Sequence, residues 1–372
     1  MSGTVDRPAA RTSPAPPTGD ARAALASSLH RGRTVLRAGG LVVRFETRRA
    51  VVYAALLVVA VVAGIAGILI GDYPITLDQV LAAFVGGTDD PLAGFFVVDV
   101  RLPRALAALL VGAALGMSGA IFQTVSGNPL GSPDIIGFTT GAATGALLQI
   151  VVFGGDTVSI AIAAFAGGLV TAAVVYGLSW RGGVAGFRLV LVGIGVGAIL
   201  SAVNALLVVR ASLESAQTAA QWLAGSLNST LWPEVQAIAV ALAVLVPLLV
   251  VVFRPTEQLT LGDASAVGIG VRVERTRFVL IILGVALMAV ATAATGPIAF
   301  VALAAPHLVK KLVRTAGVSL FGAAIMGGVL VLVSDLVARR LFAPTELAVG
   351  VITGSLGGLY LIWLLAVERK RL

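Results

Sequence analysis

The sequence predicts an all-α polytopic membrane protein with about ten transmembrane helices. Hydrophobic residues make up 58% of the 372 residues and charged residues only 12%, with a mean hydropathy of +1.02. This composition excludes a soluble domain. Uncharged apolar runs of about twenty residues, enough to cross the core of a bilayer, recur from residue 50 onward. Basic residues gather in the loops that these runs would leave on one side of the membrane.

The first 43 residues have a different composition from the rest. They are rich in Pro, Ser, Thr, Ala and Arg and show little hydrophobic periodicity, so a disordered basic tail is expected over 1–43. The transmembrane domain then covers 44–372. Its first span is the run 50–70, because the basic lead before it is too long for a cleaved signal peptide.

Nine further apolar runs complete the set of ten. Their approximate limits are 104–125, 135–153, 158–179, 188–209, 234–253, 277–295, 297–314, 318–338 and 347–367. Only Thr295-Gly296-Pro297 separates the seventh span from the eighth, so that boundary is the least well defined. A shorter amphipathic piece, Thr218–Leu227, is too short to cross the membrane.

The distribution of basic residues orients these spans. An even number of spans places both termini on one side, and that side is predicted to be the cytoplasm. Fifteen basic residues of the short loops and flanks fall there: Arg44, Arg48, Arg49, Arg181, Arg188, Arg254, Arg272, Arg275, Arg277, Lys310, Lys311, Arg314, Arg369, Lys370 and Arg371. Five fall on the opposite face: Arg101, Arg104, Arg210, Arg339 and Arg340. This is a positive-inside bias, so the net charge of +8 indicates topology and not a nucleic-acid partner.

The second span has unusual ends and an unusual interior. Arg101 and Arg104 bracket Leu102-Pro103 at its start, and a turn rich in Gly, Pro and Asn follows it. Small residues at helical spacing allow another helix to approach closely; they are Gly112, Gly116, Ser118 and Gly119. Two interpretations stay open. The span is either an ordinary packed transmembrane helix or a helix with a functional role at each of its two ends.

A faint internal repeat suggests a transporter. Ser118-Gly119-Ala120-Ile121 is followed by Pro129, and Thr295-Gly296-Pro297-Ile298 by Pro306, in each case ten residues after the glycine. The copies lie five spans apart and therefore cross the membrane in opposite senses, as in the inverted repeats of transporters. Chance is the alternative in a chain so rich in Gly and Ala.

The sequence contains no energy source of its own. A phosphate-binding loop requires Gly-Lys followed by Ser or Thr, and no Gly-Lys pair occurs. The spans also lack the acidic residues of an ion-coupled carrier, since only Asp335 lies well inside an apolar run and Arg339 can pair with it. Without cysteines and with only His30 and His307, no metal centre is expected. A transporter driven by a partner is favoured over a secondary carrier or a receptor.

The largest cytoplasmic loop, about 254–277, could receive that partner. It contains LTLGDASAVGIGVRVER, in which Asp263 can cap a short helix. Ala264, Ala266 and Val267 would give this helix an apolar face. It could dock in a groove of another protein or be a solvated connector.

Five motifs, in order, resemble the FecCD-type permeases of iron-siderophore and vitamin B12 ABC importers, most closely the ferric-enterobactin branch. They are RLPRALAALLVGAALGMSGAIFQTVSGNPLGSPDIIGF, LGDASAVGIGV, GPIAFVALAAPH, SDLVAR and TELAVGVITGSLGG. The resemblance implies a BtuC-like type II importer fold in the bacterial cytoplasmic membrane. It also implies a homologous permease as partner in a heterodimer, two ATPase subunits that bind ATP and Mg, and a siderophore-binding protein. The cargo would be a ferric siderophore, with vitamin B12 or haem as alternatives, and the chain itself would be neither an enzyme nor a cofactor binder.

The same resemblance assigns roles to individual residues. Docking of the binding protein is expected at Arg101, Arg104 and Arg339. ATPase coupling is expected at Leu261, Gly262, Asp263, Ala266 and Gly268, and the gate and translocation path at Ser118, Gly119, Asn128, Pro129 and Leu130.

Overall fold

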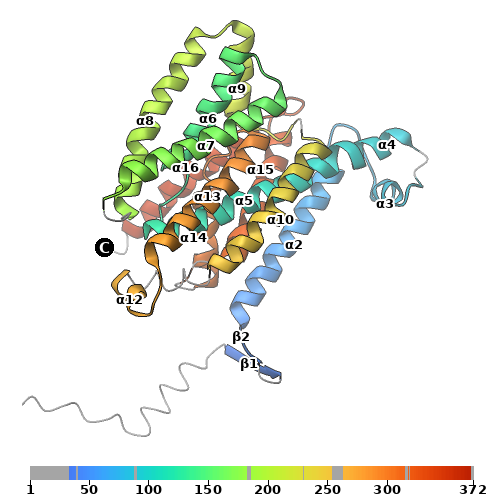
Figure 1. Cartoon of the computed structure of the whole chain (residues 1–372). Coiled ribbons are helices and arrows are strands. Elements are labelled where there is room, and N and C mark those ends of the chain that lie inside the picture. The colour runs from blue at the N-terminus through green and yellow to red at the C-terminus, as the bar shows by residue number, and fades with distance from the viewer. Residues whose placement is uncertain are drawn as a thin grey trace, which may run out of the picture. The chain divides into compact units, whose positions relative to one another are not determined.

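The computed structural model describes residues 33–38, 41–87, 90–181, 186–228, 230–253, 263–314, 317 and 319–369. Figure 1 shows its helices and strands. The chain divides into two compact units, Met1–Val52 and Tyr53–Leu372. The elements, in order, are β1 (Arg33–Ala38), β2 (Leu41–Glu46), α2 (Thr47–Leu69), α3 (Leu77–Val85), α4 (Pro91–Phe95), η1 (Phe96–Arg101), α5 (Leu102–Ser126), α6 (Phe138–Leu148), η2 (Gln149–Phe153), α7 (Thr157–Ser179), α8 (Gly186–Arg210), α9 (Leu213–Ala224), α10 (Trp232–Phe253), α12 (Asp263–Gly268), α13 (Val273–Thr295), α14 (Val301–Val313), α15 (Leu320–Arg340) and α16 (Val349–Arg369).

The first unit contains an antiparallel hairpin. Strands β1 and β2 pair from Arg33 opposite Glu46 to Ala38 opposite Leu41. The sequence predicts disorder through residue 43, so the structure differs here. The physical reason is local: runs of apolar and β-branched residues flank Gly39-Gly40, a pattern typical of a tight hairpin.

The second unit is a helical bundle, as the sequence predicts. Within the described residues, seven helical runs are long and apolar enough to span a membrane: α2, the continuous run Pro91–Ser126 through α4, η1 and α5, α7, α8, α10, α13 and α15. The other three predicted spans correspond to α6 with η2, to α14 and to α16. Each of the ten predicted apolar runs therefore lies on a helix, which confirms the all-α polytopic class.

Helix α14 is the shortest of these ten. Its 13 residues give about 20 Å, less than the hydrocarbon core of about 30 Å. The shortening comes from the break after α13, where Gly296 has φ 71° and ψ −177°, a conformation open essentially to glycine alone. Phe300 then caps α14 with φ 74°. The predicted boundary between the seventh and eighth spans is thus a real interruption of the helix.

The predicted repeat does not mark equivalent local structures. Ser118 to Ile121 lie inside α5, whereas Thr295 to Ile298 cover the end of α13 and the non-helical residues after it. Pro129 lies in a turn and Pro306 inside α14. An inverted relation between the halves stays a prediction.

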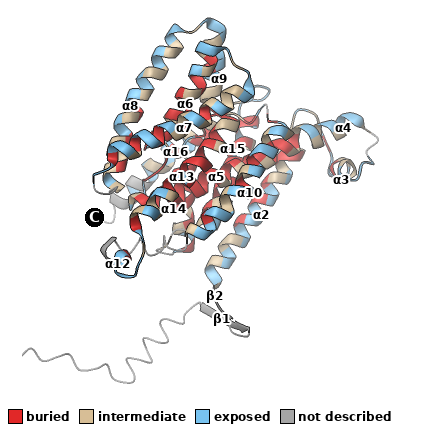
Figure 2. Ribbon diagram, in the orientation of Figure 1, coloured by how far each residue is buried: buried red, intermediate tan, exposed pale blue. Residues whose placement is uncertain are grey.

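Helix α5 is the centre of the bundle, and it packs against α15, α13, α14 and α10. In Figure 2 it is the most continuously buried helix, and 78% of the apolar window of its span is buried, compared with 11% for α8. Its small residues explain the close packing. At Gly112, Gly116 and Gly119 an added methyl group would lie within 3.0 Å of a backbone carbonyl of α15 or α14.

Among the described residues, four short helices, α3, α4, α9 and α12, lie between the long apolar helices. Thr76 and Gln79 form a capping box at the start of α3, and Asp90 with Pro91 begins α4; both are standard N-terminal signals. The sequence predicted a short piece at Thr218–Leu227, and α9 occupies Leu213–Ala224. Helices α3 and α4 were not predicted.

Candidate functional site

A buried cluster of charges occupies the end of the bundle where α5 begins and α15 ends. Every guanidinium nitrogen of Arg104 is engaged. Nη2 donates to Asp335 Oδ1 at 2.9 Å and to Asn228 Oδ1 at 2.8 Å, and Nε donates to both Asp335 oxygens at 3.1 and 3.2 Å. Nη1 pairs with Glu346 Oε2 at 2.9 Å. One side chain of α5 thus joins α15 to two loops.

Asp335 is the shared acceptor of this cluster. It is fully buried and also pairs with Arg339, one helical turn further along α15. Arg339 Nε lies 2.9 Å from Asp335 Oδ2, and Arg339 Nη1 donates to the carbonyl of Gly67 at the end of α2, at 3.0 Å. The pairing that the sequence predicted between Asp335 and Arg339 is present, and Arg104 is its third member.

Arg101 lies apart from this cluster and closes the end of α2. It donates to the carbonyls of Ile68 at 2.8 Å, Leu69 at 3.2 Å and Tyr73 at 2.6 Å. The last carbonyls of a helix lack partners within the helix and carry partial negative charge, so a guanidinium is well suited to them. A side chain at Gly71 would collide with this guanidinium.

All three arginines expected to dock a binding protein are therefore buried, with 5 to 7% of their surface exposed. Their guanidinium groups donate hydrogen bonds to carbonyl and carboxylate oxygens of the same chain. Sequence reasoning missed Glu346 and Asn228, although both lie in or beside segments that it had singled out. Arg340 is more open: its side chain is 43% exposed, 3.8 Å from Asp72, and it donates to the carbonyl of Gly71 at 2.7 Å.

The residues expected at the gate fall into two groups that the structure does not bring together. Ser118 Oγ donates to the carbonyl of Gly284 at 2.7 Å in the core, and Gly119 packs on Ala302 of α14. Asn128, Pro129 and Leu130 form an exposed turn after α5. In it, Asn128 Oδ1 accepts from the Leu130 N–H at 2.9 Å, an Asx turn.

Asp134 links that turn region to the break before α14. Its carboxylate accepts from the Thr139 hydroxyl at 2.6 Å and from the Phe300 N–H at 3.4 Å. Burial raises the pKa of the Asp134 carboxyl, and these two donors act in the opposite direction. The segment after α5 and the start of α14 are thus held together by one side chain that sequence reasoning did not single out.

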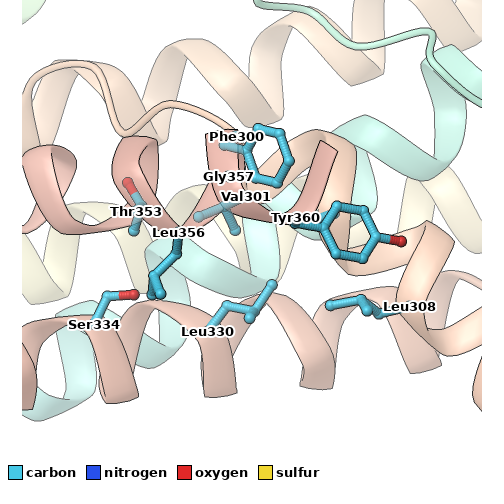
Figure 3. A pocket seen from close by; sticks show the side chains of 10 residues that line it. Phe300, Val301, Leu308, Leu330, Ser334, Thr353, Leu356, Gly357 and Tyr360 are labelled. Carbon is cyan, nitrogen blue, oxygen red and sulfur yellow. The ribbon is translucent and has the colours of Figure 1, made fainter. Parts of the chain in front are cut away.

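A cavity of about 200 Å³ lies between α14, α15 and α16. Figure 3 shows the Phe300 and Tyr360 rings on one side and Leu330 and Ser334 on the other. The Phe300 ring occupies the space that a side chain at Gly357 would need. The Tyr360 hydroxyl lies 2.9 Å from His307 Nδ1. The lining is mainly apolar, so a group bound in the cavity would be held by van der Waals contacts and by few hydrogen bonds.

The region expected to couple to an ATPase contains the short helix α12. Leu261 and Gly262 lie outside the described residues, and Asp263 is the first residue of α12. Ala266 is fully buried, whereas Val267 is 61% exposed and Ile269 60%. A side chain at Gly268 would meet no atom of the described residues within 4 Å. Ala266 therefore packs into the protein, while Val267 and the next residue but one, Ile269, present apolar side chains outward.

The described residues offer no metal site, because none of their His, Asp and Glu side chains form a group of three or more that could hold an ion. The candidate sites are therefore a buried charge cluster, a gate region and an exposed docking helix.

Comparison with known proteins gives a consistent result. The model of the FecCD transport family matches residues 56–367. The ferric enterobactin transport system permease protein FepG of Escherichia coli (strain K12) is 46% identical over 329 residues, covering 88% of this chain and 99% of FepG.

Further relatives and a solved structure extend the match. The achromobactin transport system permease protein CbrC of Dickeya dadantii (strain 3937) is 37% identical, covering 85% of this chain and 90% of CbrC. A solved metal-chelate type ABC transporter in an inward-facing conformation is 28% identical with a TM-score of 0.76, covering 87% of this chain and all of that chain.

Proposed function

The chain belongs to the FecCD transport family, and we propose that it is the membrane permease subunit of an ABC importer for a ferric siderophore. The observation that carries this proposal is the likeness to a ferric enterobactin permease along almost the whole of both chains. We further propose that it lies in a bacterial cytoplasmic membrane with both termini inside, as the charge distribution favours.

The test is growth under iron limitation. Cells that lack this chain but keep the other importer components should fail to grow on the ferric siderophore, and restoring the chain should restore growth. Growth on haem or vitamin B12 that depends on the chain, with unchanged use of ferric siderophores, would show that the cargo is a different one.

We propose that ATP hydrolysis is supplied by separate ATPase subunits, which bind ATP and Mg, and that they receive α12. The exposed Val267 of this helix and Ile269 just after it form an apolar surface that suits a groove, in the manner of other helix-in-groove contacts. The chain alone would then neither hydrolyse ATP nor transport.

Gly268 provides a sharp test of that coupling. Because the described residues leave open space around Gly268, Gly268→Trp should leave the fold intact and obstruct a partner. We expect normal insertion of the variant, with most of the co-purified ATPase subunit and most of the uptake lost. Gly268→Ala, the size control, should behave nearly as the unchanged chain. Full coupling by Gly268→Trp would argue against docking at α12.

We propose that a homologous permease packs against α16. Gly354 and Gly358 are spaced as in the GxxxG motif, which allows close helix approach in membranes. A side chain at either position would meet no atom of the described residues within 4 Å. Leu359 and Ile362 beside them are 65% and 67% exposed. The expected arrangement is a heterodimer.

The docking of a siderophore-binding protein at the outer end stays a proposal. Arg101, Arg104 and Arg339 would then act indirectly, because their hydrogen bonds hold α2, α5 and α15 in register beneath the surface. Direct contact would fall to more open groups such as Arg340 and Glu346.

A further inference from the structure

The segment between the first two spans, residues 71–100, presents an apolar surface that its own fold does not use. On α3, Leu77 is 54% exposed, Leu81 58%, Phe84 53% and Val85 86%. At 100° per residue, these four positions fall on one stripe of the helix. Leu92 and Phe95 of α4 add to it, with 57% and 52% exposed.

This surface belongs to a well-fixed element. A small core of Ile68, Ile75, Val80 and Val97 holds α3 to the end of α2 and to η1. The rings of Tyr73 and Phe96 stack with centroids 5.2 Å apart. The stripe therefore points away from a satisfied core and is not a loosely packed part of it.

Further contacts fix the two ends of the segment. The Tyr73 hydroxyl donates to Asp90 at 2.7 Å, and the Trp232 indole N–H of α10 donates to the carbonyl of Val98 at 3.0 Å. The first bond closes the segment on itself and the second ties it to α10, and Figure 1 shows α3 and α4 projecting beside the bundle.

The length of the second span places this element at the edge of the bilayer. The helical run Pro91–Ser126 has 36 residues, about 54 Å, whereas the hydrocarbon core is about 30 Å thick. The excess must tilt or leave the core. Since α4 and η1 form the first part of this run, they and α3 lie where the core ends.

All charged side chains of the segment are acidic. Between Ile70 and Arg101 there are five aspartates and no lysine or arginine: Asp72, Asp78, Asp89, Asp90 and Asp99. The Tyr73 hydroxyl holds the pKa of the Asp90 carboxyl below its usual value, and two backbone N–H groups act in the same direction. The segment therefore combines an apolar stripe with acidic side chains and without basic ones.

We infer that α3 and α4 lie in the outer interface of the bilayer, with the stripe of Leu77, Leu81, Phe84 and Val85 immersed among the lipid acyl chains. Helices with one apolar face lie in this way, with that face about 5–10 Å into the headgroup boundary. A protein partner is less well suited, because the stripe contains none of the Tyr, Trp and Arg side chains that dominate the energetics of protein interfaces. The segment would anchor the ends of α2 and α5 at a fixed depth.

The absence of cysteine from the sequence permits a direct test by single-cysteine spin labelling. Leu81→Cys and Phe84→Cys place the label on the stripe, and Asp78→Cys, on the same helix at its polar edge, is the matched control. The labelled chain is purified with its co-expressed partner subunits in nanodiscs of phosphatidylethanolamine and phosphatidylglycerol. Collisions of each label with oxygen, which partitions into lipid, and with a water-soluble nickel chelate are then measured.

Labels at Leu81→Cys and Phe84→Cys should show a ratio of oxygen to nickel collisions several-fold above that at Asp78→Cys. Equal ratios at the three positions, with free nickel access, would mean that the stripe faces water and would overturn the inference. Low collision rates with both reagents on the stripe would mean that a protein covers it, which would equally overturn it. These readings do not depend on transport, so they stand apart from a failure of the proposed function.

Discussion

Replacing Asp335 by asparagine should cause the largest loss of stability of any single change in the charge cluster. The carboxylate is fully buried and is shared by Arg104 and Arg339. Asparagine keeps the size of the side chain but leaves two buried guanidiniums with one counter-charge, Glu346, whose side chain is 34% exposed. Removing one partner of a buried ion pair costs about 3–5 kcal/mol. We expect a clearly lower unfolding temperature and a lower yield of the purified complex.

Two further variants separate this effect from general disruption. Arg340→Gln removes a charge whose side chain is 43% exposed, and such a surface pair contributes only about 0–1 kcal/mol. Combining Asp335→Asn with Arg339→Gln restores the charge balance and should recover part of the lost stability. If Asp335→Asn unfolds at the temperature of the unchanged chain, the cluster does not stabilise this end of the bundle.

Gly119→Ala should produce the second large effect, through packing alone. The added methyl group would lie within 3.0 Å of the backbone carbonyl of Ala302, and neither helix backbone can move aside without separating α5 from α14. Overpacking of a core typically costs about 1–3 kcal/mol. The variant should unfold at a lower temperature and lose uptake, since α14 contacts the segment after α5 through Asp134.

The matched control is Gly177→Ala on α7. A methyl group there meets no atom within 4 Å, and alanine is favoured over glycine in a helix by about 1 kcal/mol. This variant should be as stable as the unchanged chain or slightly more so. Equal stability of Gly119→Ala and Gly177→Ala would contradict the close approach of α5 and α14.

The sequence predicts the helices well because the length of an apolar run can be read from neighbouring residues alone. All ten apolar runs lie on helices, and the small residues of the second span do allow close helix contacts, as at Gly119. The capping box of Thr76 and Gln79 is also visible in the sequence, yet it was overlooked because the segment lies between spans.

The sequence is less informative about which distant residues meet. Arg104 and Asp335 are 231 positions apart, and nothing local indicates that Glu346 and Asn228 complete their cluster. For the same reason the three arginines were expected at an exposed docking surface, while the structure buries them among internal acceptors. Likewise, no residue preference indicates the left-handed conformation of Phe300.

The central claim is that this chain forms the path for a ferric siderophore and depends on partners for energy. Uptake of a radiolabelled ferric siderophore into proteoliposomes tests it most directly, with the chain, its partner permease, the ATPase and the binding protein reconstituted together. We expect uptake that requires ATP and every component, and we expect Gly268→Trp to remove most of it. Uptake by this chain alone under an ion gradient, or no uptake of any ferric siderophore by the ATP-hydrolysing complex, would contradict the claim.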